Sequence, residues 1–269
     1  MSPEEFVLCK KLRWLHLGVA GVEKSLHSAL VSSEVIVTNA RGIHSDVMSE
    51  YVLAAILSCA NRFDLAAAAK PPKEWRQKEI VRHRHSVVGK TVGIIGAGAI
   101  GSAAARLCRV CGMKAIGIRR SPKKGAPEGF EKIYGIDDLP QLLAESDYVV
   151  LAAPLTSETQ GLLGAAQFAM MKPSAFFINI ARGAMVDEAA LIAALREKKI
   201  AGAVLDVFAE EPLPAKSPLW TLENVFITPH ISGNFEQYVE RVGKQFAENL
   251  ARYLRGEALM NVVDKKTGY

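Results

Sequence analysis

The sequence has few cysteines, no long hydrophobic run and no internal repeat. Only 4 of its 269 residues are cysteine, too few for a disulfide scaffold and typical of a reducing compartment. Its longest apolar stretch, residues 51–60, is well short of the roughly 20 residues that cross a bilayer. The N-terminus lacks the basic start and apolar run of a secretory signal. We therefore expect a cytoplasmic protein without a membrane segment.

Composition and charge are those of an ordinary globular protein. Hydrophobic residues make up 49%, charged residues 23% and aromatic residues 7% of the chain, which argues against a disordered chain, a collagen-like fibre and a coiled coil. At roughly 100–200 residues per domain, the length predicts two domains or one large one. The net charge of +5 comes from dispersed basic residues, which would favour anionic small molecules as readily as nucleic acid. We expect no nucleic-acid partner.

Two of the cysteines form a C-x-x-C pair, Cys108 and Cys111, in a segment predicted to be helical. A zinc site needs a second pair of ligands or a histidine at suitable spacing, and neither is nearby in the sequence. Because free cysteines usually behave as small apolar side chains, we interpret these thiols as packing groups. The sequence predicts no metal site.

Residues 88–230 alternate short β-rich runs with helical segments, a pattern typical of a parallel sheet with crossover helices. The predicted strands are Thr91–Ile95, Lys114–Ile118, Tyr148–Ala152, Ala175–Asn179, Gly202–Leu205 and Val225–Ile227. The predicted helices lie near Ile100–Cys111, Ile136–Ala144, Glu158–Leu163, Ala165–Met170 and Glu188–Lys198. The strands are almost continuously apolar, as in sheets covered on both faces. We predict an α/β fold with a Rossmann-type doubly wound parallel sheet.

Helical segments flank this block. Residues 45–70 read as one helix with Ser45 as its N-cap, ended by the prolines at 71–72. Val81–His85 is interpreted as a basic surface loop, and Phe235–Leu254 as a long amphipathic helix. The first 43 residues hold only two predicted strands, Leu12–Leu17 and Glu34–Thr38.

A glycine-rich loop follows the first predicted strand of the block. Gly96, Gly98 and Gly101 form G-x-G-x-x-G directly before a helix. In this context the first glycine makes the tight turn, the second lets the backbone approach a pyrophosphate, and the third permits close helix–strand packing. Ala99 and Ile100 begin the helix, whose free N–H groups bind the anion. The loop predicts a dinucleotide site.

The choice between NAD and NADP is made at the end of the next strand, where a carboxylate would bind the ribose 2′-OH of NAD. No carboxylate stands there; the strand is followed by Arg119, Arg120 and Ser121, with two lysines at 123–124. A 2′-phosphate would meet two guanidinium groups and a hydroxyl. We predict that NADP(H) is preferred over NAD(H).

Polar residues follow three further predicted strands, where open parallel sheets place their ligands. These segments are Asn179–Gly183, Leu205–Leu213 and Thr228–Gly233. Other motifs are Ala20–Val22, Asn39–Gly42, the glycine loop, and Ala153–Thr156 with Thr159. In this order the segments strongly resemble the D-isomer-specific 2-hydroxyacid dehydrogenases, and the glyoxylate/hydroxypyruvate reductases among them, over essentially the whole chain.

The resemblance implies catalytic roles for three residues. Arg182 would grip the carboxylate of a 2-oxo acid and polarise the adjacent carbonyl. His230 would protonate the carbonyl oxygen as hydride arrives from the nicotinamide, and would act as the base in the reverse direction. Glu211, the residue before Pro212, would pair with this histidine and favour its imidazolium form. The adjacent Glu210 is expected to face solvent.

The same resemblance implies the remaining contacts. Asp206 would hold the nicotinamide carboxamide, and Gly233 would leave room beside it. Further cofactor contacts are implied for Pro154, Thr159 and Ala181. The substrate would be bound by Ala20 and Gly21 together with Arg182. A homodimer is expected through the cofactor domain and its excursion at residues 71–75.

The resemblance also implies the domain organisation. Residues 1–44 would be part of a flavodoxin-like substrate domain, 45–234 the dinucleotide-binding domain, and 235–269 a helix returning to the substrate domain. In the family, several tens of residues precede the segment that matches Leu12–Val22. The chain is thus expected to be N-terminally shortened, either as a piece of a longer protein or as a natural short form.

The expected activity is hydride transfer between NADP(H) and a small 2-oxo acid, such as glyoxylate or hydroxypyruvate, giving a D-2-hydroxy acid. The alternative is a weakly active or inactive dinucleotide-binding relative, either truncated or similar to the transcriptional corepressors that share this fold. A formate dehydrogenase is disfavoured because it would have glutamine at the position of Glu211. A regulated phosphoglycerate dehydrogenase is disfavoured by the lack of a C-terminal regulatory domain and by the basic Arg119–Arg120 pair.

Overall fold

The computed structural model describes residues 2–22, 25–122, 125–265 and 268. It divides into two compact units, which are described separately. Unit 1 comprises residues 1–44 and 234–269, and unit 2 comprises residues 45–233. The sequence placed the corresponding domain limits after residues 44 and 234.

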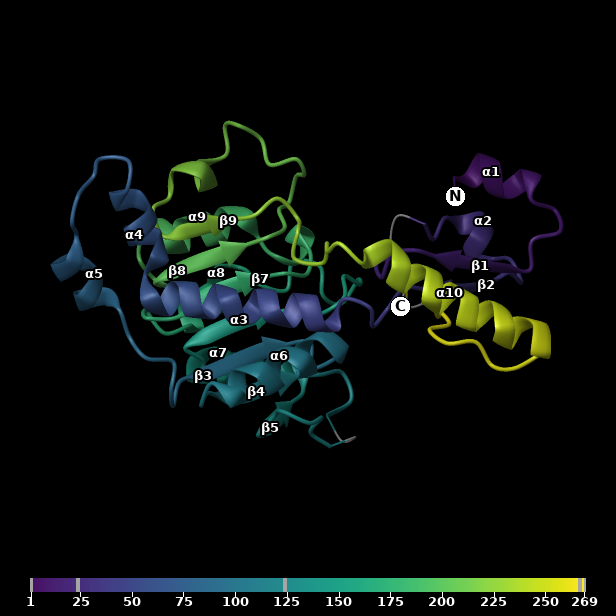
Figure 1. The fold of residues 1–269 in the computed structure, drawn as a ribbon, viewed down its shortest axis with the longest axis horizontal. Helices are drawn as coiled ribbons and strands as arrows, with labels where there is room; N and C mark the ends of the chain where they lie inside the picture. The colour runs from purple at the N-terminus through teal and green to yellow at the C-terminus, as the bar shows by residue number, and fades with distance from the viewer. Residues whose placement is uncertain (1, 23–24, 123–124, 266–267, 269) are drawn as a thin grey trace. The chain divides into compact units, whose positions relative to one another are not determined.

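Unit 2 is built on a seven-stranded sheet in which every neighbouring pair of strands is parallel. The strands are β3 (Thr91–Ile95), β4 (Lys114–Ile118), β5 (Lys132–Tyr134), β6 (Tyr148–Leu151), β7 (Phe176–Asn179), β8 (Gly202–Leu205) and β9 (Val225–Ile227). Their order is β5-β4-β3-β6-β7-β8-β9, so the chain runs outward from β3, returns to β6, and runs outward on the other side (Figure 1). The predicted doubly wound α/β fold is confirmed, with its topological switch point between β3 and β6.

The two faces of the sheet carry separate apolar cores because side chains alternate along each strand. On one face, Ile95, Leu151 and Phe177 pack with residues of α7 (Leu139–Glu145), α8 (Ala165–Met170) and α9 (Glu188–Arg196). On the other face, Ile94 and Ile178 pack with residues of α3 (Ser45–Asn61) and α6 (Ala99–Val110). Burial on both faces explains why the strands read as continuous apolar runs.

Two details of the sheet and its connections differ from the sequence-based expectations. The edge strand β5 was missed, because only its three residues pair with β4 and its sequence, Lys-Ile-Tyr, is too short to show a pattern. The helix predicted over Glu158–Leu163 is wrong: this segment forms turns followed by a single bridge from Leu163 to Val186. The described 3-10 turns are Ile136–Asp138, Gly183–Met185 and Pro218–Thr221.

The segment before the sheet, predicted as one helix over residues 45–70, is divided into two helices. Arg62, which has a φ of 55°, separates α3 from α4 (Phe63–Ala69). Ser45 is the first helical residue rather than a cap, and its buried hydroxyl has no hydrogen-bond partner among the described residues. The predicted basic loop at Val81–His85 is largely helical, because α5 spans Gln77–His83. Among the described residues no single helix has the length and hydropathy of a membrane span; α3 and α4, bent by 67°, meet those criteria only as a pair.

Unit 1 contains the parallel pair β1 (Trp14–Leu17) and β2 (Ile36–Asn39) with helices α1 (Pro3–Leu8), α2 (Ser28–Val31) and α10 (Tyr238–Arg255). Helix α10 begins three residues later than the sequence predicted. The Trp14 ring of β1 stacks on Phe246 and Tyr253 of α10, with ring centroids 5.3 and 5.5 Å away. A small core around Leu30 and Val37 completes the unit.

Candidate active site

The glycine-rich loop lies at the carboxyl ends of β3 and β6. Gly96 has a φ of 111°, and a Cβ built on it would lie 2.6 Å from the backbone nitrogen of Ala153. A Cβ on Gly101 would collide with the carbonyl oxygen of Gly96. Both glycines are therefore required by the protein itself, one for the turn and one for the approach of α6 to the loop.

Gly98 differs from its two neighbours. Its φ of −92° suits any residue, and a Cβ built on it would meet no protein atom within 4 Å. Gly98 and Ala99 are exposed at the N-terminus of the 12-residue helix α6, whose N-cap provides no side-chain acceptor. Space and unpaired N–H donors at this point fit a phosphate group, so the loop is suited to a dinucleotide.

The basic segment after β4 borders this loop. The backbone N–H groups of Gly96 and Ala97 both donate to the carbonyl of Ile118, the last residue of β4. Arg119 follows at once and is partly buried, whereas Arg120 and Ser121 are exposed. The guanidinium of Arg119 donates to the carbonyl of Gly125 at 3.4 Å. Lys123 and Lys124 lie outside the described residues.

The loop after β6 is fastened by the threonine of its motif. The hydroxyl of Thr159 donates to the carbonyl of Pro154 at 2.7 Å and accepts from the backbone N–H of Thr156 at 2.8 Å. Because Ala153 lies against Gly96, this closed loop sits beside the glycine-rich loop. Pro154 and Thr159 are thus held on one side of the predicted dinucleotide site.

Arg182 follows β7 in extended backbone, with a φ of −146°. Asn179 at the end of β7 accepts from the N–H of Ala181 and donates to the carbonyl of Arg182. The guanidinium Nη1 donates to the carbonyl of Ala181 at 2.7 Å. Ala181 is buried and Arg182 half-buried, so the guanidinium is fixed at the carboxyl edge of the sheet.

Asp206 follows β8 and is completely buried. Its Oδ1 accepts from the hydroxyl of Thr228 at 2.6 Å and from the N–H of Ile231 at 2.8 Å. Its Oδ2 accepts from the N–H of Ser232 at 2.9 Å. The carboxylate therefore ties the segment after β9 to the end of β8, and of its roughly four acceptor positions three are used within the protein.

His230 and Glu211 form a hydrogen-bonded pair. The imidazole Nδ1 lies 2.7 Å from Oε2 of Glu211, whose Oε1 accepts from the N–H of Phe208 at 3.0 Å. The two side chains are 48% and 36% exposed, so both can reach a ligand. His230 has a φ of 55°, a left-handed conformation that costs free energy in a non-glycine residue. The backbone N–H of His230 donates to the backbone carbonyls of Asp206 and Thr228.

Sequence reasoning did not assign Tyr51 or Thr228 to the site. The Tyr51 hydroxyl on α3 lies 2.6 Å from Oγ1 of Thr228. Thr228 belongs to the Thr-Pro-His motif, so its position was a usable signal. Tyr51 stands 177 residues earlier in the chain, and no spacing rule could have linked it to that motif.

Ala20 and Gly21, the residues proposed to bind the substrate, belong to unit 1. They follow β1, and the side chain of Asn39 at the end of β2 donates to the carbonyl of Ala20 at 2.7 Å. The loop is thus fixed to the carboxyl end of the two-stranded sheet.

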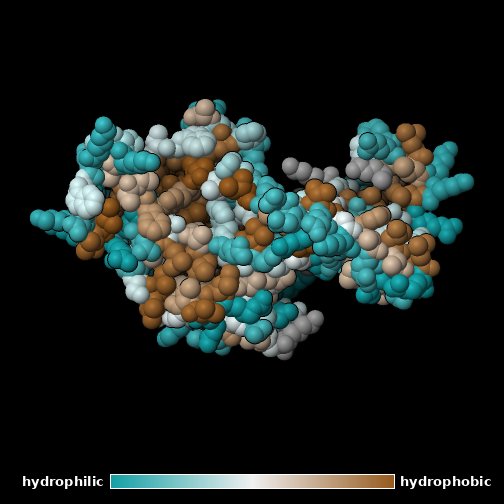
Figure 2. All heavy atoms as spheres, viewed as in Figure 1, coloured by the Kyte–Doolittle hydropathy of each residue, from teal (hydrophilic) through white to brown (hydrophobic). Residues whose placement is uncertain are grey.

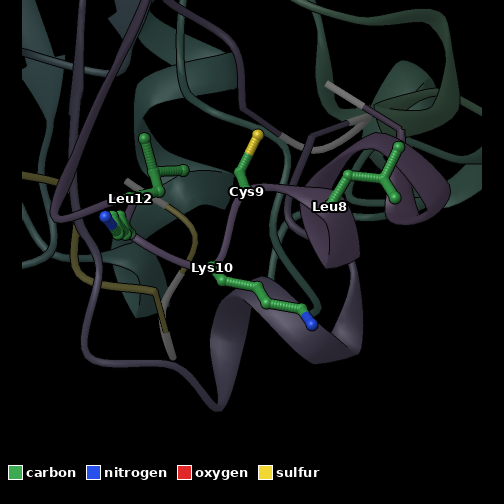
Figure 3. Close-up of a pocket in the computed structure, with 5 residues that line it drawn as sticks. Leu8, Cys9, Lys10 and Leu12 are labelled. Atoms are coloured by element: carbon green, nitrogen blue, oxygen red, sulfur yellow. The ribbon is translucent and has the colours of Figure 1, made fainter.

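A hollow of about 580 Å³ also lies in unit 1, lined by the consecutive residues Leu8–Leu12. Figure 3 shows its labelled side chains pointing in different directions, so they do not converge on a ligand position. It contains none of the predicted site residues. Within the described part of the chain, no group of three or more His, Cys, Asp or Glu side chains is placed to hold a metal ion.

Comparisons with known proteins agree with this arrangement. The sequence profile of the D-isomer specific 2-hydroxyacid dehydrogenase, NAD binding domain, matches residues 53–232. A glyoxylate reductase of Thermococcus gammatolerans is 39% identical over 237 residues, which cover 86% of this chain and 70% of that protein.

The similar solved structures include two that cover the whole of this chain. A D-isomer specific 2-hydroxyacid dehydrogenase from Xanthobacter autotrophicus, in complex with NADPH and MES, has a TM-score of 0.90 and 36% identity and covers 100% of this chain and 82% of its own. An NADPH-dependent glyoxylate/hydroxypyruvate reductase from Sinorhizobium meliloti, in complex with NADP and sulfate, has a TM-score of 0.89 and 31% identity, covering 100% and 84%. The chain therefore belongs to the D-isomer specific 2-hydroxyacid dehydrogenases, a family of oxidoreductases with a nicotinamide-dinucleotide domain.

Proposed function

We propose that this protein reduces small 2-oxo acids to D-2-hydroxy acids with NADPH, and that glyoxylate and hydroxypyruvate are among its substrates. The observation that carries the proposal is the His230–Glu211 pair, held 2.7 Å apart at the same sheet edge as Arg182 and the glycine-rich loop. The glyoxylate reductase of Thermococcus gammatolerans and the glyoxylate/hydroxypyruvate reductase of Sinorhizobium meliloti support the choice of substrates.

Arg182, Glu211 and His230 have separate roles in the proposed reaction. NADPH, when bound, supplies the hydride. Arg182 has a planar, permanently charged fork that can bind the carboxylate of the oxo acid and polarise the neighbouring carbonyl. Glu211 accepts from Nδ1 of His230, which leaves Nε2 to donate a proton to the carbonyl oxygen as it becomes an alkoxide. The pair thus holds the proton donor in one orientation.

Holding the cofactor is assigned to the two loops beside β3. Gly96, Gly98, Ala99, Ile100 and Gly101 would bind the pyrophosphate at the N-terminus of α6. Pro154, Thr159, Ala181, Asp206 and Gly233 would line the rest of the dinucleotide. For Asp206 this role is limited to the acceptor position on Oδ2 that its three hydrogen bonds leave. Within unit 1, Ala20 and Gly21 are proposed to contact the substrate.

Preference for NADP(H) rests on the segment after β4. Arg119, Arg120 and Ser121 stand where an NAD-specific site would have a carboxylate, and the glycine-rich loop is bonded to the adjacent residue Ile118. The double variant Arg119→Asp, Arg120→Ala should lower the NADPH:NADH ratio of kcat/KM by about two orders of magnitude. An unchanged ratio would show that this segment does not select the cofactor.

The activity itself is tested with a panel of glyoxylate, hydroxypyruvate and phenylpyruvate, following the consumption of NADPH. His230→Ala should abolish most of the turnover while NADPH still binds, since the histidine is not part of the pyrophosphate site. NADPH binding without oxidation by any oxo acid would contradict the proposal and favour a non-enzymatic dinucleotide-binding protein. The family membership and the intact His230–Glu211 pair weigh against that alternative.

We also propose a homodimer and a cytoplasmic location. Phe63, Trp75, Val81, Val88 and Val110 of unit 2 are all more than half exposed, and Figure 2 shows apolar side chains gathered where α3 and α6 face the viewer. Exposed apolar surface of this kind is typical of protein interfaces. Light scattering should give twice the 29.1 kDa of one chain, and Trp75→Asp should shift the mass to one chain. The cytoplasmic location rests on the low cysteine content.

A further inference from the structure

The segment that carries His230 is held by a chain of hydrogen bonds that begins on α3. The Tyr51 hydroxyl lies 2.6 Å from Oγ1 of Thr228, and Oγ1 lies 2.6 Å from Oδ1 of Asp206. Asp206 then accepts from the N–H groups of Ile231 and Ser232. Three separate elements, α3 and the segments after β8 and β9, are joined in this way within unit 2.

The direction of each hydrogen bond follows from the groups involved. The Asp206 carboxylate only accepts, so Thr228 donates its single proton to it. Oγ1 of Thr228 is then free only to accept, and Tyr51 must be the donor. Burial raises the pKa of Tyr51 to about 12, so the phenol keeps its proton at neutral pH. The hydrogen bonds therefore all point in one direction: Tyr51 donates to Thr228, and Thr228 donates to Asp206.

The turn at His230 needs such support. A left-handed non-glycine residue is strained by about 1–2 kcal/mol, and His230 has a φ of 55°. The two residues that follow it, Ile231 and Ser232, are both anchored on the Asp206 carboxylate. If that carboxylate rotates, the backbone on the C-terminal side of His230 loses its anchor, and the imidazole no longer points in one direction.

We propose that Tyr51 is a positioning residue, which acts through Thr228 and Asp206 to hold the His230 turn in its reactive orientation. Its hydroxyl reaches Thr228, and the polar contacts described above connect it to His230 only through that residue. The importance of this orientation for the reaction rests on the proposed function. The structural part, control of the turn by the hydroxyl, stands on the hydrogen bonds alone.

Tyr51→Phe removes the hydroxyl and keeps the ring, and Thr228→Val removes the next link. Thr228→Ser keeps a hydroxyl in that place. Tyr148→Phe is the matched control: Tyr148 is buried in the same unit, and its hydroxyl makes one hydrogen bond of 2.7 Å to Nε2 of His85. Tyr148 begins β6, so it lies at the sheet edge opposite to the site.

The first measurement needs no activity. Amide hydrogen exchange by NMR on the ligand-free protein should show the N–H groups of Ile231 and Ser232 exchanging roughly three- to tenfold faster in Tyr51→Phe. Thr228→Val should produce at least as large an increase. Tyr148→Phe should leave these two amides unchanged. Equal exchange rates in Tyr51→Phe and the unaltered protein would overturn the proposal.

The second measurement is kinetic. Tyr51→Phe should lower kcat for oxo-acid reduction roughly three- to tenfold, with NADPH affinity within about twofold and an increased solvent deuterium isotope effect. A mere loss of folded enzyme would leave the isotope effect unchanged. Tyr148→Phe should match the unaltered enzyme, and Thr228→Ser should keep most of its activity.

The double variant Tyr51→Phe, Thr228→Val decides whether the two residues act in series. Without the Thr228 hydroxyl, Tyr51 has no path to Asp206, so the double variant should be no slower than Thr228→Val alone. Losses that multiply would overturn the proposed chain. If the unaltered protein reduced no oxo acid, the proposed function would fail, while amide exchange would still decide whether Tyr51 controls the turn.

Discussion

Gly96→Ala and Gly98→Ala should damage different properties of the protein, because only Gly96 is required by the fold. Gly96 has a φ of 111°, and a Cβ there would lie 2.6 Å from the backbone nitrogen of Ala153. Gly98 has an ordinary φ of −92° and open space around its Cβ position. Gly96→Ala should therefore damage stability, and Gly98→Ala should damage binding.

The size of each effect follows from these geometries. For Gly96→Ala, the left-handed backbone costs about 1–2 kcal/mol and the backbone contact about 1–3 kcal/mol. At about 2–4 °C per kcal/mol for a unit of this size, Tm should fall by roughly 5–15 °C. For Gly98→Ala, the weaker helix cap and the reduced entropy of the unfolded chain oppose each other, so the free energy of unfolding should change by less than about 1 kcal/mol.

Thermal unfolding without ligand measures the first effect, and quenching or transfer of protein fluorescence on titration with NADPH measures the second. Gly98→Ala should bind NADPH at least about tenfold more weakly, because its methyl group would occupy the space proposed for the pyrophosphate. Full-strength NADPH binding by Gly98→Ala would refute the assignment of this loop to the pyrophosphate. A loss of Tm in Gly98→Ala as large as that in Gly96→Ala would refute the reasoning about space.

Three further predictions concern single side chains. Glu211→Gln should lower kcat about tenfold or more, whereas the exposed neighbour variant Glu210→Gln should keep full activity; equal rates for both would remove Glu211 from the mechanism. Arg182→Lys should raise KM for the oxo acid roughly tenfold, because an ammonium cannot reproduce the two-pronged contact; an unchanged KM would count against that contact. Burial raises the pKa of the Cys108 thiol to about 12, so at pH 8 a thiol reagent should modify the exposed Cys9 and leave Cys108 intact until the protein unfolds, as peptide mass mapping would show.

The sequence predicted the central sheet well because its strands are apolar on both faces. Four strands, including Thr91–Ile95 and Gly202–Leu205, have the bounds expected from their composition. The strand Lys132–Tyr134 was not predicted, because three residues at a sheet edge are too few to show a periodic pattern. Glu158–Leu163 was mistaken for a helix because its composition suits one, whereas Thr159 in fact closes a turn onto Pro154. Helix propensity does not reveal a local side-chain-to-backbone hydrogen bond of this kind.

The candidate site was predictable where residue type alone limits the chemistry. Gly96 and Gly101 stand in a spacing that has one common structural use, and the geometry at both positions agrees with it. Tyr51 could not be found, because a tyrosine in a largely apolar helix usually belongs to the core, and its partner lies 177 residues away. The left-handed backbone at His230 could not be predicted either, since histidine does not indicate a positive φ in the way glycine does.

Backbone packing between neighbouring loops sets the distance between Arg182 and His230 in unit 2. A Cβ on Gly183 would collide with the backbone of Phe208 and Ala209, so the loop after β7 lies directly on the loop after β8. Arg182 precedes Gly183, and the N–H of Phe208 holds the Glu211 carboxylate that pairs with His230. Any side chain at position 183 would push these two loops apart. Arg182 would then move away from His230 although neither residue had been altered, and near-attack geometry of this kind tolerates displacements of only about 1 Å.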